Sequence, residues 1–258
     1  MRGPASLFPR EHGGWVMLYA PLVAGVIRGG NLRWDVIAVA AAVTAAYFAR
    51  LPALAIINRG TRSGAATRWL AVCGIAVGLS ALWLLWHPRR SALAVIALTG
   101  AALFVVHLAL TMRREERTAP GELAGIGGLA LSAPLGYAGA MGGSAAEAAV
   151  LWVLNWLFFG SSVFYVKWRV RRLLAERKGL SSAGASRALI AYHVVGAVVL
   201  IALAWSALIP WRAIGAFAPL GLRYLLPLIV GKTPTLTQVG VTEIGLSAAF
   251  VAILTAAY

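Results

Sequence analysis

Long, almost uninterrupted apolar stretches recur along the whole 258-residue chain, and they constrain its fold more than any other feature. Several exceed about 18 residues, the length that a helix needs to cross a bilayer core about 30 Å thick. Charged residues make up only 12% of the chain, whereas soluble domains carry about 25%. We therefore expect an all-α protein, a polytopic bundle of membrane helices that forms one domain over residues 1–258.

Nine of these stretches are expected to span the membrane. Tryptophans lie near many of their ends, where indole rings favour the membrane–water interface. Short loops join the spans, so consecutive spans run in opposite directions. The predicted spans are 13–29, 34–57, 69–87, 91–111, 122–141, 146–166, 188–209, 212–230 and 239–258.

The placement of Lys and Arg predicts the orientation. The net charge is +15, and 16 of the 23 basic residues fall in the N-terminal segment and the even-numbered loops. Basic loops stay on the cytoplasmic side, so we expect a cytoplasmic N-terminus and an outward C-terminus in a bacterial cytoplasmic (inner) membrane. The basic residues cluster between spans and not over a soluble face. They therefore indicate membrane lipids as partners and no nucleic acid, and nothing in the pattern predicts an oligomeric state.

Two of the basic loops resemble each other. The stretches "RGTRSGAATRWL" from Arg59 and "KGLSSAGASRAL" from Lys178 align without gaps, and each follows a long span and opens the next. Chance similarity between small, Gly-rich segments is one explanation. The other is an internal pseudo-repeat that includes loops 58–68 and 176–187, as in membrane proteins whose repeated halves surround a central site.

Four further stretches resemble the YwiC-like membrane protein family. They are the opening "PREHGGW", the "YAPLVAG" that follows it, the later "FYVKWRVR" and the closing "VGVTEIGLS". The resemblance covers most of the chain and implies a bacterial multi-pass membrane protein. It names no ligand and no reaction.

The span count and the two similar loops also resemble UbiA-type prenyltransferases, in which Asp-rich motifs on these loops hold Mg²⁺ that binds an isoprenyl diphosphate. The matching stretch here is "NRGTRSGAA", in which Asn58 agrees with the N-D-x-x-D-x-x-x-D pattern, but Arg59, Arg62 and Ala66 replace the aspartates. Mg²⁺ prefers hard oxygen ligands, so we predict no metal and no cofactor. Arginine binds phosphate or carboxylate directly. The likeness therefore implies a divergent protein that binds or modifies an anionic isoprenoid or lipid in a basic, cytoplasm-facing cavity.

Polar side chains within and beside the spans are the candidates for this site, because they are costly in a membrane and are usually functional. Arg223 and Glu243 are expected to pair across the last two spans, since a buried charge needs a partner; a structural clamp and a functional pair are equal alternatives. The expected substrate-binding residues are Arg50, Asn58, Arg59, Arg62, Tyr165, Lys167, Arg169, His193, Arg223 and Glu243.

Glu11 and His12 directly precede the first span, and two roles are open for them. An acid in the first turn of a helix complements the helix dipole. Alternatively, the two residues fold under the bundle towards the Arg-rich loops and act as catalytic acid and base. The glycines at 13 and 14 give the chain the freedom to bend that way.

Two other function classes remain open. One is a small transporter or export factor for an anion, with repeated halves around a midplane site. The other is a haem-binding membrane protein that uses His107 and His193, which lie at similar depths in two spans. Glu147 and Asn155 lie towards the outer ends of spans and are expected to be less connected to the site.

Overall fold

A computed structural model describes residues 12–59, 64–178, 183–230 and 236–258. These residues form α-helices, one 3₁₀-helix and short turns, without a β-strand in the described ranges. The elements are α1 (His12–Gly29), α2 (Trp34–Arg59), α3 (Gly64–Leu84), α4 (Arg90–Met112), α5 (Ala119–Ala130), α6 (Ser132–Gly139), α7 (Ala145–Lys178), α8 (Ala183–Trp205), η1 (Trp211–Phe217), α9 (Pro219–Val230) and α10 (Leu236–Ala256).

Six of these helices are long and apolar enough to cross a membrane, namely α2, α3, α4, α7, α8 and α10. The expected all-α, multi-pass membrane protein is therefore confirmed. The other three predicted spans correspond to α1, to α5 with α6, and to η1 with α9. The count of nine crossings and the cytoplasmic side of the N-terminus stay predictions.

The fifth predicted span, expected to be one helix, is divided into α5 and α6 at Leu131. Pro134 explains the break, because proline has no N–H to donate to the carbonyl four residues earlier and its ring crowds that carbonyl. At the break itself, the Leu131 N–H bonds the Gly128 carbonyl at 3.3 Å in a 3₁₀-type turn. Helix α6 begins at Ser132, directly after this break.

The eighth predicted span is divided for the same reason. Pro219 has no N–H for the Gly215 carbonyl, which accepts from Ala218 at 3.0 Å instead. The chain therefore runs as a 3₁₀-helix until Phe217, and α9 begins with proline at its first position, where a missing N–H costs nothing. This arrangement places the start of α9 inside the bundle.

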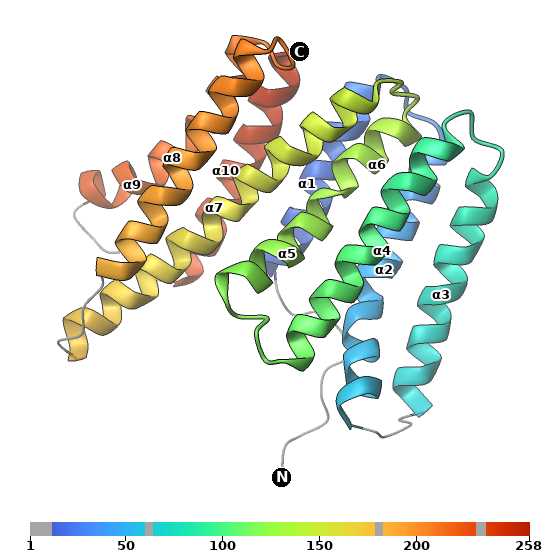
Figure 1. Ribbon diagram of the computed structural model, residues 1–258, viewed down its shortest axis with the longest axis horizontal. Coiled ribbons are helices and arrows are strands. Elements are labelled where there is room, and N and C mark those ends of the chain that lie inside the picture. The colour runs from blue at the N-terminus through green and yellow to red at the C-terminus, as the bar shows by residue number, and fades with distance from the viewer. Residues whose placement is uncertain (1–11, 60–63, 179–182, 231–235) are drawn as a thin grey trace.

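The helices lie in two layers. Figure 1 shows α7, α5, α6 and α4 side by side, with α10, α1 and α2 behind them. Helix α1 joins the layers because it packs against α6 on one side and α10 on the other. All helices begin or end near one of two ends of the bundle, which we call the His12 end and the Tyr258 end.

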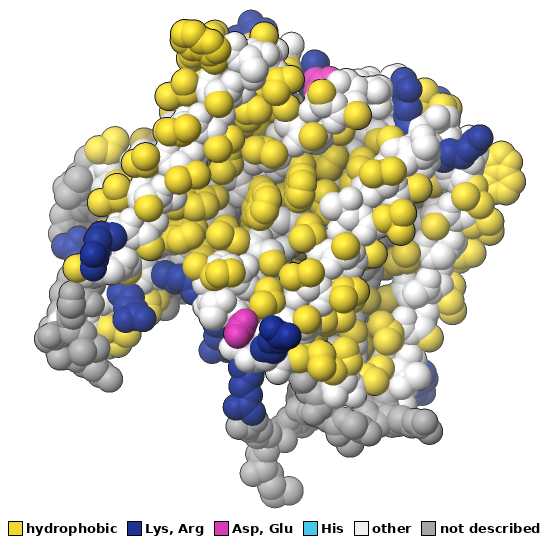
Figure 2. All heavy atoms as spheres, viewed as in Figure 1, with side chains coloured by type: hydrophobic (Ala, Val, Ile, Leu, Met, Phe, Trp, Pro, Cys, Tyr) yellow, Lys and Arg dark blue, Asp and Glu magenta, His cyan; other side chains and the backbone are white. Residues whose placement is uncertain are grey.

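The surface matches this arrangement. In Figure 2 apolar side chains cover the middle of the visible face, and Lys, Arg and acidic side chains gather towards its two ends. Large apolar side chains such as Leu98 and Ile190 are more than half exposed along α4 and α8. A surface of this kind is stable against lipid tails and not against water.

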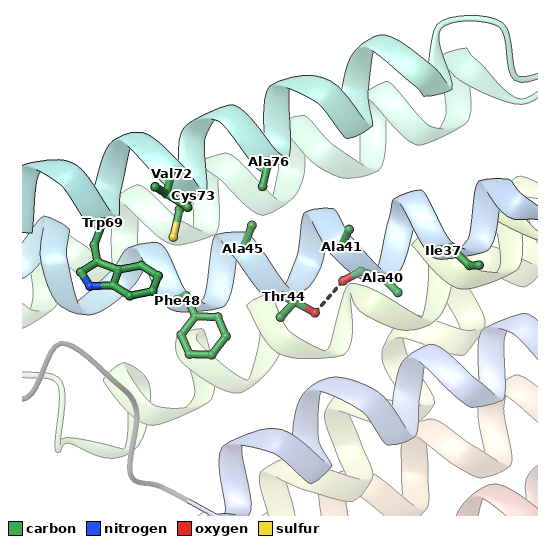
Figure 3. A pocket seen from close by; sticks show the side chains of 10 residues that line it. All are labelled: Ile37, Ala40, Ala41, Thr44, Ala45, Phe48, Trp69, Val72, Cys73 and Ala76. Atoms are coloured by element: carbon green, nitrogen blue, oxygen red, sulfur yellow. Dashed lines mark hydrogen bonds between the residues drawn. The ribbon is translucent and has the colours of Figure 1, made fainter.

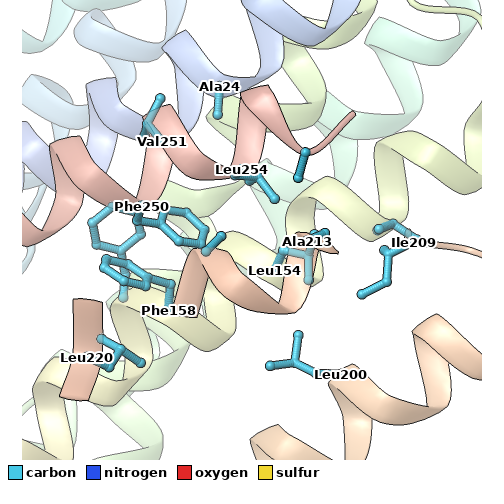
Figure 4. Packing of buried hydrophobic residues seen from close by; sticks show 14 of the residues in the cluster. Ala24, Leu154, Phe158, Leu200, Ile209, Ala213, Leu220, Phe250, Val251 and Leu254 are labelled. Carbon is cyan, nitrogen blue, oxygen red and sulfur yellow. The ribbon is translucent and has the colours of Figure 1, made fainter. Parts of the chain in front are cut away.

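The main core joins α7, α10 and η1. The rings of Phe158 and Phe250 stack with centroids 4.0 Å apart (Figure 4). Phe217 packs edge-on against both rings. Phe158 and Phe250 are fully buried. This core fixes α7 and α10 relative to each other directly beside the polar cluster described next.

Candidate functional site

An ion pair between α9 and α10 forms the centre of the candidate site. The Arg223 guanidinium donates through Nη2 to Glu243 Oε2 at 2.6 Å. Two serines of α7 complete the cluster: Arg223 donates through Nη1 to Ser161 Oγ at 3.0 Å and through Nη2 to Ser162 Oγ at 3.2 Å. Ser162 in turn donates to Glu243 at 2.7 Å. The expected pairing of Arg223 with Glu243 is thus confirmed, and α7 takes part in it.

The cluster lies within the bundle. Arg223 is only 2% exposed, and the Glu243 side chain is 20% exposed. Glu243 is seven residues into α10, which corresponds to a depth of roughly 10 Å from the His12 end. Ionisable groups at such a depth are costly and usually mark a functional site.

Helix α7 presents a second arginine to the same region. Ser161, Tyr165 and Arg169 are spaced by four residues, so they lie on one face of the helix. The Arg223 guanidinium lies over the Tyr165 ring at 5.1 Å from its centroid. The side chain of Arg169 is 5% exposed and interacts electrostatically with the same tyrosine. Two buried arginines therefore lie beside Tyr165: Arg223, which pairs with Glu243, and Arg169, one turn along α7.

Aromatic side chains enclose this polar cluster. Tyr165 packs edge-on against Tyr224 of α9, with centroids 5.6 Å apart, and contacts Trp168 one turn along α7. Tyr224 also faces His193 of α8, whose Nε2 lies 3.5 Å from the tyrosine hydroxyl. His193 Nδ1 lies 2.9 Å from the Leu189 carbonyl of its own helix. The site thus extends from α10 through α9 to α8.

Five of the predicted residues meet at this site: Tyr165, Arg169, His193, Arg223 and Glu243. Lys167 lies on a different face of α7, where it pairs with Glu122 of α5 at 3.1 Å and bonds the Arg117 carbonyl. Arg50 lies in α2, which packs against α1, α3, α4 and α6. The structure therefore does not place these two side chains with the other five.

The remaining predicted residues fall outside what the structure describes. Glu11 and Arg62 lie outside the described residues. His12 begins α1, and Asn58 and Arg59 end α2, but only their helical backbone is described. The roles of Glu11 and His12 as acid and base, and of the loop arginines as anion ligands, stay predictions.

The two histidines of the haem hypothesis lie against different helices. The His107 ring lies against Gly125 of α5, whereas the His193 ring faces Tyr224 of α9. Within the described ranges, no three His, Cys, Asp or Glu side chains gather into a metal-binding group. The haem and transport hypotheses stay predictions.

A second polar cluster, at the Tyr258 end, was not expected from the sequence. Glu147 of α7 pairs with Arg28 of α1 and accepts from the Tyr137 hydroxyl, so it is more connected than expected. Arg28 also lies over the Tyr258 ring. Both carboxylate oxygens of Glu147 have partners, so this carboxylate joins helices, while the buried Tyr258 hydroxyl has no hydrogen-bond partner among the described residues.

His87, near this end, is also structural. It is 2% exposed, its Nδ1 accepts from the Arg89 N–H, and its Nε2 lies 3.2 Å from the Gly139 carbonyl. The neighbouring Asp35 accepts from the Trp83 indole at 3.0 Å. No residue spacing in the sequence predicts these contacts, because they join helices far apart in the chain.

An apolar pocket of about 490 Å³ lies between α2 and α3 (Figure 3). Its lining is almost entirely hydrocarbon and aromatic, including Phe48, Trp69 and Cys73. The pocket suits a lipid tail and has no group that would hold a charged head group. The polar cluster at Arg223 is therefore the better candidate for specific recognition.

Comparison with known proteins gives a family and no activity. The sequence model of the family described as YwiC-like protein matches residues 8–137. The uncharacterized protein YwiC of Bacillus subtilis (strain 168) is 28% identical over 178 residues, which cover 67% of this chain and 69% of that protein. No solved structure matches the chain, and the UbiA-type architecture stays a prediction. Together with the multi-pass helical fold, the family match shows that the chain belongs to the YwiC-like protein family.

Proposed function

We propose that this YwiC-like membrane protein binds the anionic head group of an isoprenoid or other lipid-like molecule at the cluster of Arg223, Arg169 and Glu243. Arginine would hold the anion directly, without a carboxylate-bound Mg²⁺. The observation that carries this proposal is the burial of two arginine side chains beside Tyr165, with the buried Nε of Arg223 left without a hydrogen-bond partner among the described residues.

The burial of two arginines in one region supports an anionic ligand. A guanidinium stays protonated in proteins, so neither arginine escapes the cost of burial by losing its proton. Replacing a buried ion pair by apolar residues often leaves a protein equally stable or more stable. A buried arginine suits phosphate or carboxylate, which its guanidinium binds in a planar, bidentate way.

The surroundings support a ligand with an apolar tail. Leu222 and Leu225, on either side of Arg223 in α9, are 47% and 50% exposed. The arginine points into the bundle, while these neighbours face the lipid side. A head group held by Arg223 would therefore have its hydrocarbon chain beside an apolar surface. Aromatic rings such as Tyr165 and Tyr224 would shield the head group from water.

Native mass spectrometry of the gently extracted protein tests the proposal. Wild type is compared with Arg169→Gln, which removes the buried guanidinium of α7, and with Arg171→Gln, which removes an exposed one two residues away. We expect a co-purifying anionic lipid or isoprenoid phosphate on wild type and Arg171→Gln, and its loss from Arg169→Gln. Wild type without such a ligand, or equal retention by both variants, would contradict the proposal.

A bound ligand would then allow an assay for catalysis. Glu11→Gln and His12→Gln are predicted to abolish transfer while leaving the co-purifying ligand in place, because an acid or base acts on the reaction and not on binding. Activity that is equal with and without Mg²⁺ would agree with a site that lacks carboxylate ligands for the metal.

A further inference from the structure

The ion pair of the candidate site leaves two hydrogen-bonding positions open. The contact uses Nη2 of Arg223 and Oε2 of Glu243. Arg223 Nε and Glu243 Oε1 are both buried, and neither has a hydrogen-bond partner among the described residues. Each partner of the ion pair therefore has one open position: a donor on Arg223 and an acceptor on Glu243.

The neighbouring serines do not fill the open acceptor. Ser162 has one hydroxyl proton, which it donates to Oε2 of Glu243. Ser161 donates its proton to the Phe158 carbonyl at 2.6 Å. A guanidinium only donates, so the open Nε of Arg223 needs an acceptor. A group that satisfied both positions would have to accept from Arg223 and donate to Glu243.

We propose that Glu243 makes the site selective for a terminal phosphate that carries an O–H, in its singly protonated form, over sulfate and phosphodiesters. This inference rests on the proposed function, because it concerns the same anion site. A singly protonated phosphate monoester or inorganic phosphate has negative oxygens for Arg223 and one O–H for Glu243. Sulfate and phosphodiesters carry no proton at neutral pH, so their oxygens would face the lone pairs of Glu243.

Selectivity between anions would explain why a site for anions contains a carboxylate. A purely cationic site would hold sulfate and phosphate equally well, since both present negative oxygens to arginine. A fixed acceptor repels every anion that has no proton to donate, and it accepts a hydrogen bond from an anion that has one. Hydrogen bonds to charged groups are stronger than neutral ones, so one such contact is expected to discriminate by about tenfold or more.

Two pairs of probes test the inference and separate the two sources of phosphate. Inorganic phosphate is compared with sulfate through the thermal unfolding midpoint of the purified wild-type protein. Phosphatidic acid, a monoester, is compared with phosphatidylglycerol, a diester, through lipid retention in native mass spectrometry. We expect about tenfold or tighter binding of the monoester or of phosphate in at least one arm. The arm that shows it identifies a lipid head group or a free phosphate as the ligand.

The Glu243→Gln variant supplies the matched change. A glutamine amide both donates and accepts, so the preference for phosphate over sulfate, or for the monoester over the diester, is expected to disappear. Retention of the preference in this variant would overturn the inference. The wild-type comparison does not depend on the folding of the variant and stands by itself.

The outcomes distinguish this inference from the proposed function. Equal binding of both members of each pair by wild type would refute the role of Glu243 while leaving an anion site. No binding of any of the four probes by wild type would overturn the anion site and the selectivity together.

Discussion

The Arg223–Glu243 pair predicts an unequal response to the removal of its two members. In Glu243→Leu the guanidinium stays buried and charged, with only Ser161 and Ser162 as acceptors. In Arg223→Met the carboxylate keeps the hydroxyl of Ser162 and is partly exposed. We therefore expect Glu243→Leu to be the more destabilising change.

The magnitude follows from the geometry. Two unit charges about 4 Å apart attract by about 4 kcal/mol at an effective dielectric constant near 20, and breaking a buried pair costs about 3–5 kcal/mol in measured cases. Arg223 is 2% exposed, so Glu243→Leu should lie within that range. Arg223→Met should cost about 1–3 kcal/mol, because the carboxylate left behind is partly exposed and keeps one hydrogen bond.

A double-mutant cycle provides the assay. The free energy of unfolding is measured by equilibrium denaturation in mixed detergent micelles for wild type, for each single variant and for the Arg223→Met/Glu243→Leu double variant. The double variant carries no buried charge at this pair, so it should be no less stable than the better single variant. The coupling energy is then at least the cost of Glu243→Leu alone, about 3–5 kcal/mol. Additive effects of the two changes would refute the reasoning, because they would show that the pair has no net interaction.

Two further changes test the packing around the site and between the layers. Phe158→Ala removes the ring stacked 4.0 Å from Phe250 and should lower the free energy of unfolding by about 3–5 kcal/mol; a loss below about 1 kcal/mol would contradict the assigned core. Gly25→Ala would place a Cβ 1.9 Å from the Ala133 carbonyl oxygen, whereas Gly74→Ala meets nothing within 4 Å, so thermal unfolding in detergent should show a loss of about 1–3 kcal/mol or more for Gly25→Ala only.

The ion pair illustrates what could be predicted from the sequence. Glu243 is one of only eight acidic residues, and it lies in an apolar run close to Arg223. A charge within an apolar segment needs a partner, and few basic residues lie close to Glu243 in the sequence. Ser161 and Ser162 could not be found in the same way, because serine is common in membrane helices and satisfies itself on the carbonyls of its own helix. Only the packing of α7 against α9 and α10 shows that they bond the arginine.

The interrupted helices show a different limit. Pro134 and Pro219 are visible in the sequence, but proline is tolerated in many membrane helices when neighbours satisfy the freed carbonyl. In α2 the helix continues through Pro52, whereas at Pro134 it breaks. The difference depends on which groups pack beside each proline. The sequence also does not show which way two nearby basic residues of α7 point. Lys167 pairs with Glu122, whereas Arg169 is buried in the polar cluster.

The proposal of a binding site concerns a buried cluster that could also hold the helices together. The stacked aromatic core of Phe158, Phe217 and Phe250 already joins α7, η1 and α10, and apolar contacts of this kind leave no polar atom unsatisfied. At the Tyr258 end, both carboxylate oxygens of Glu147 have partners in Arg28 and Tyr137, although the Tyr258 hydroxyl beside them is buried without one. The Arg223–Glu243 pair instead keeps a buried donor and a buried acceptor open. Because unsatisfied buried groups are costly, the open positions favour a ligand that completes them.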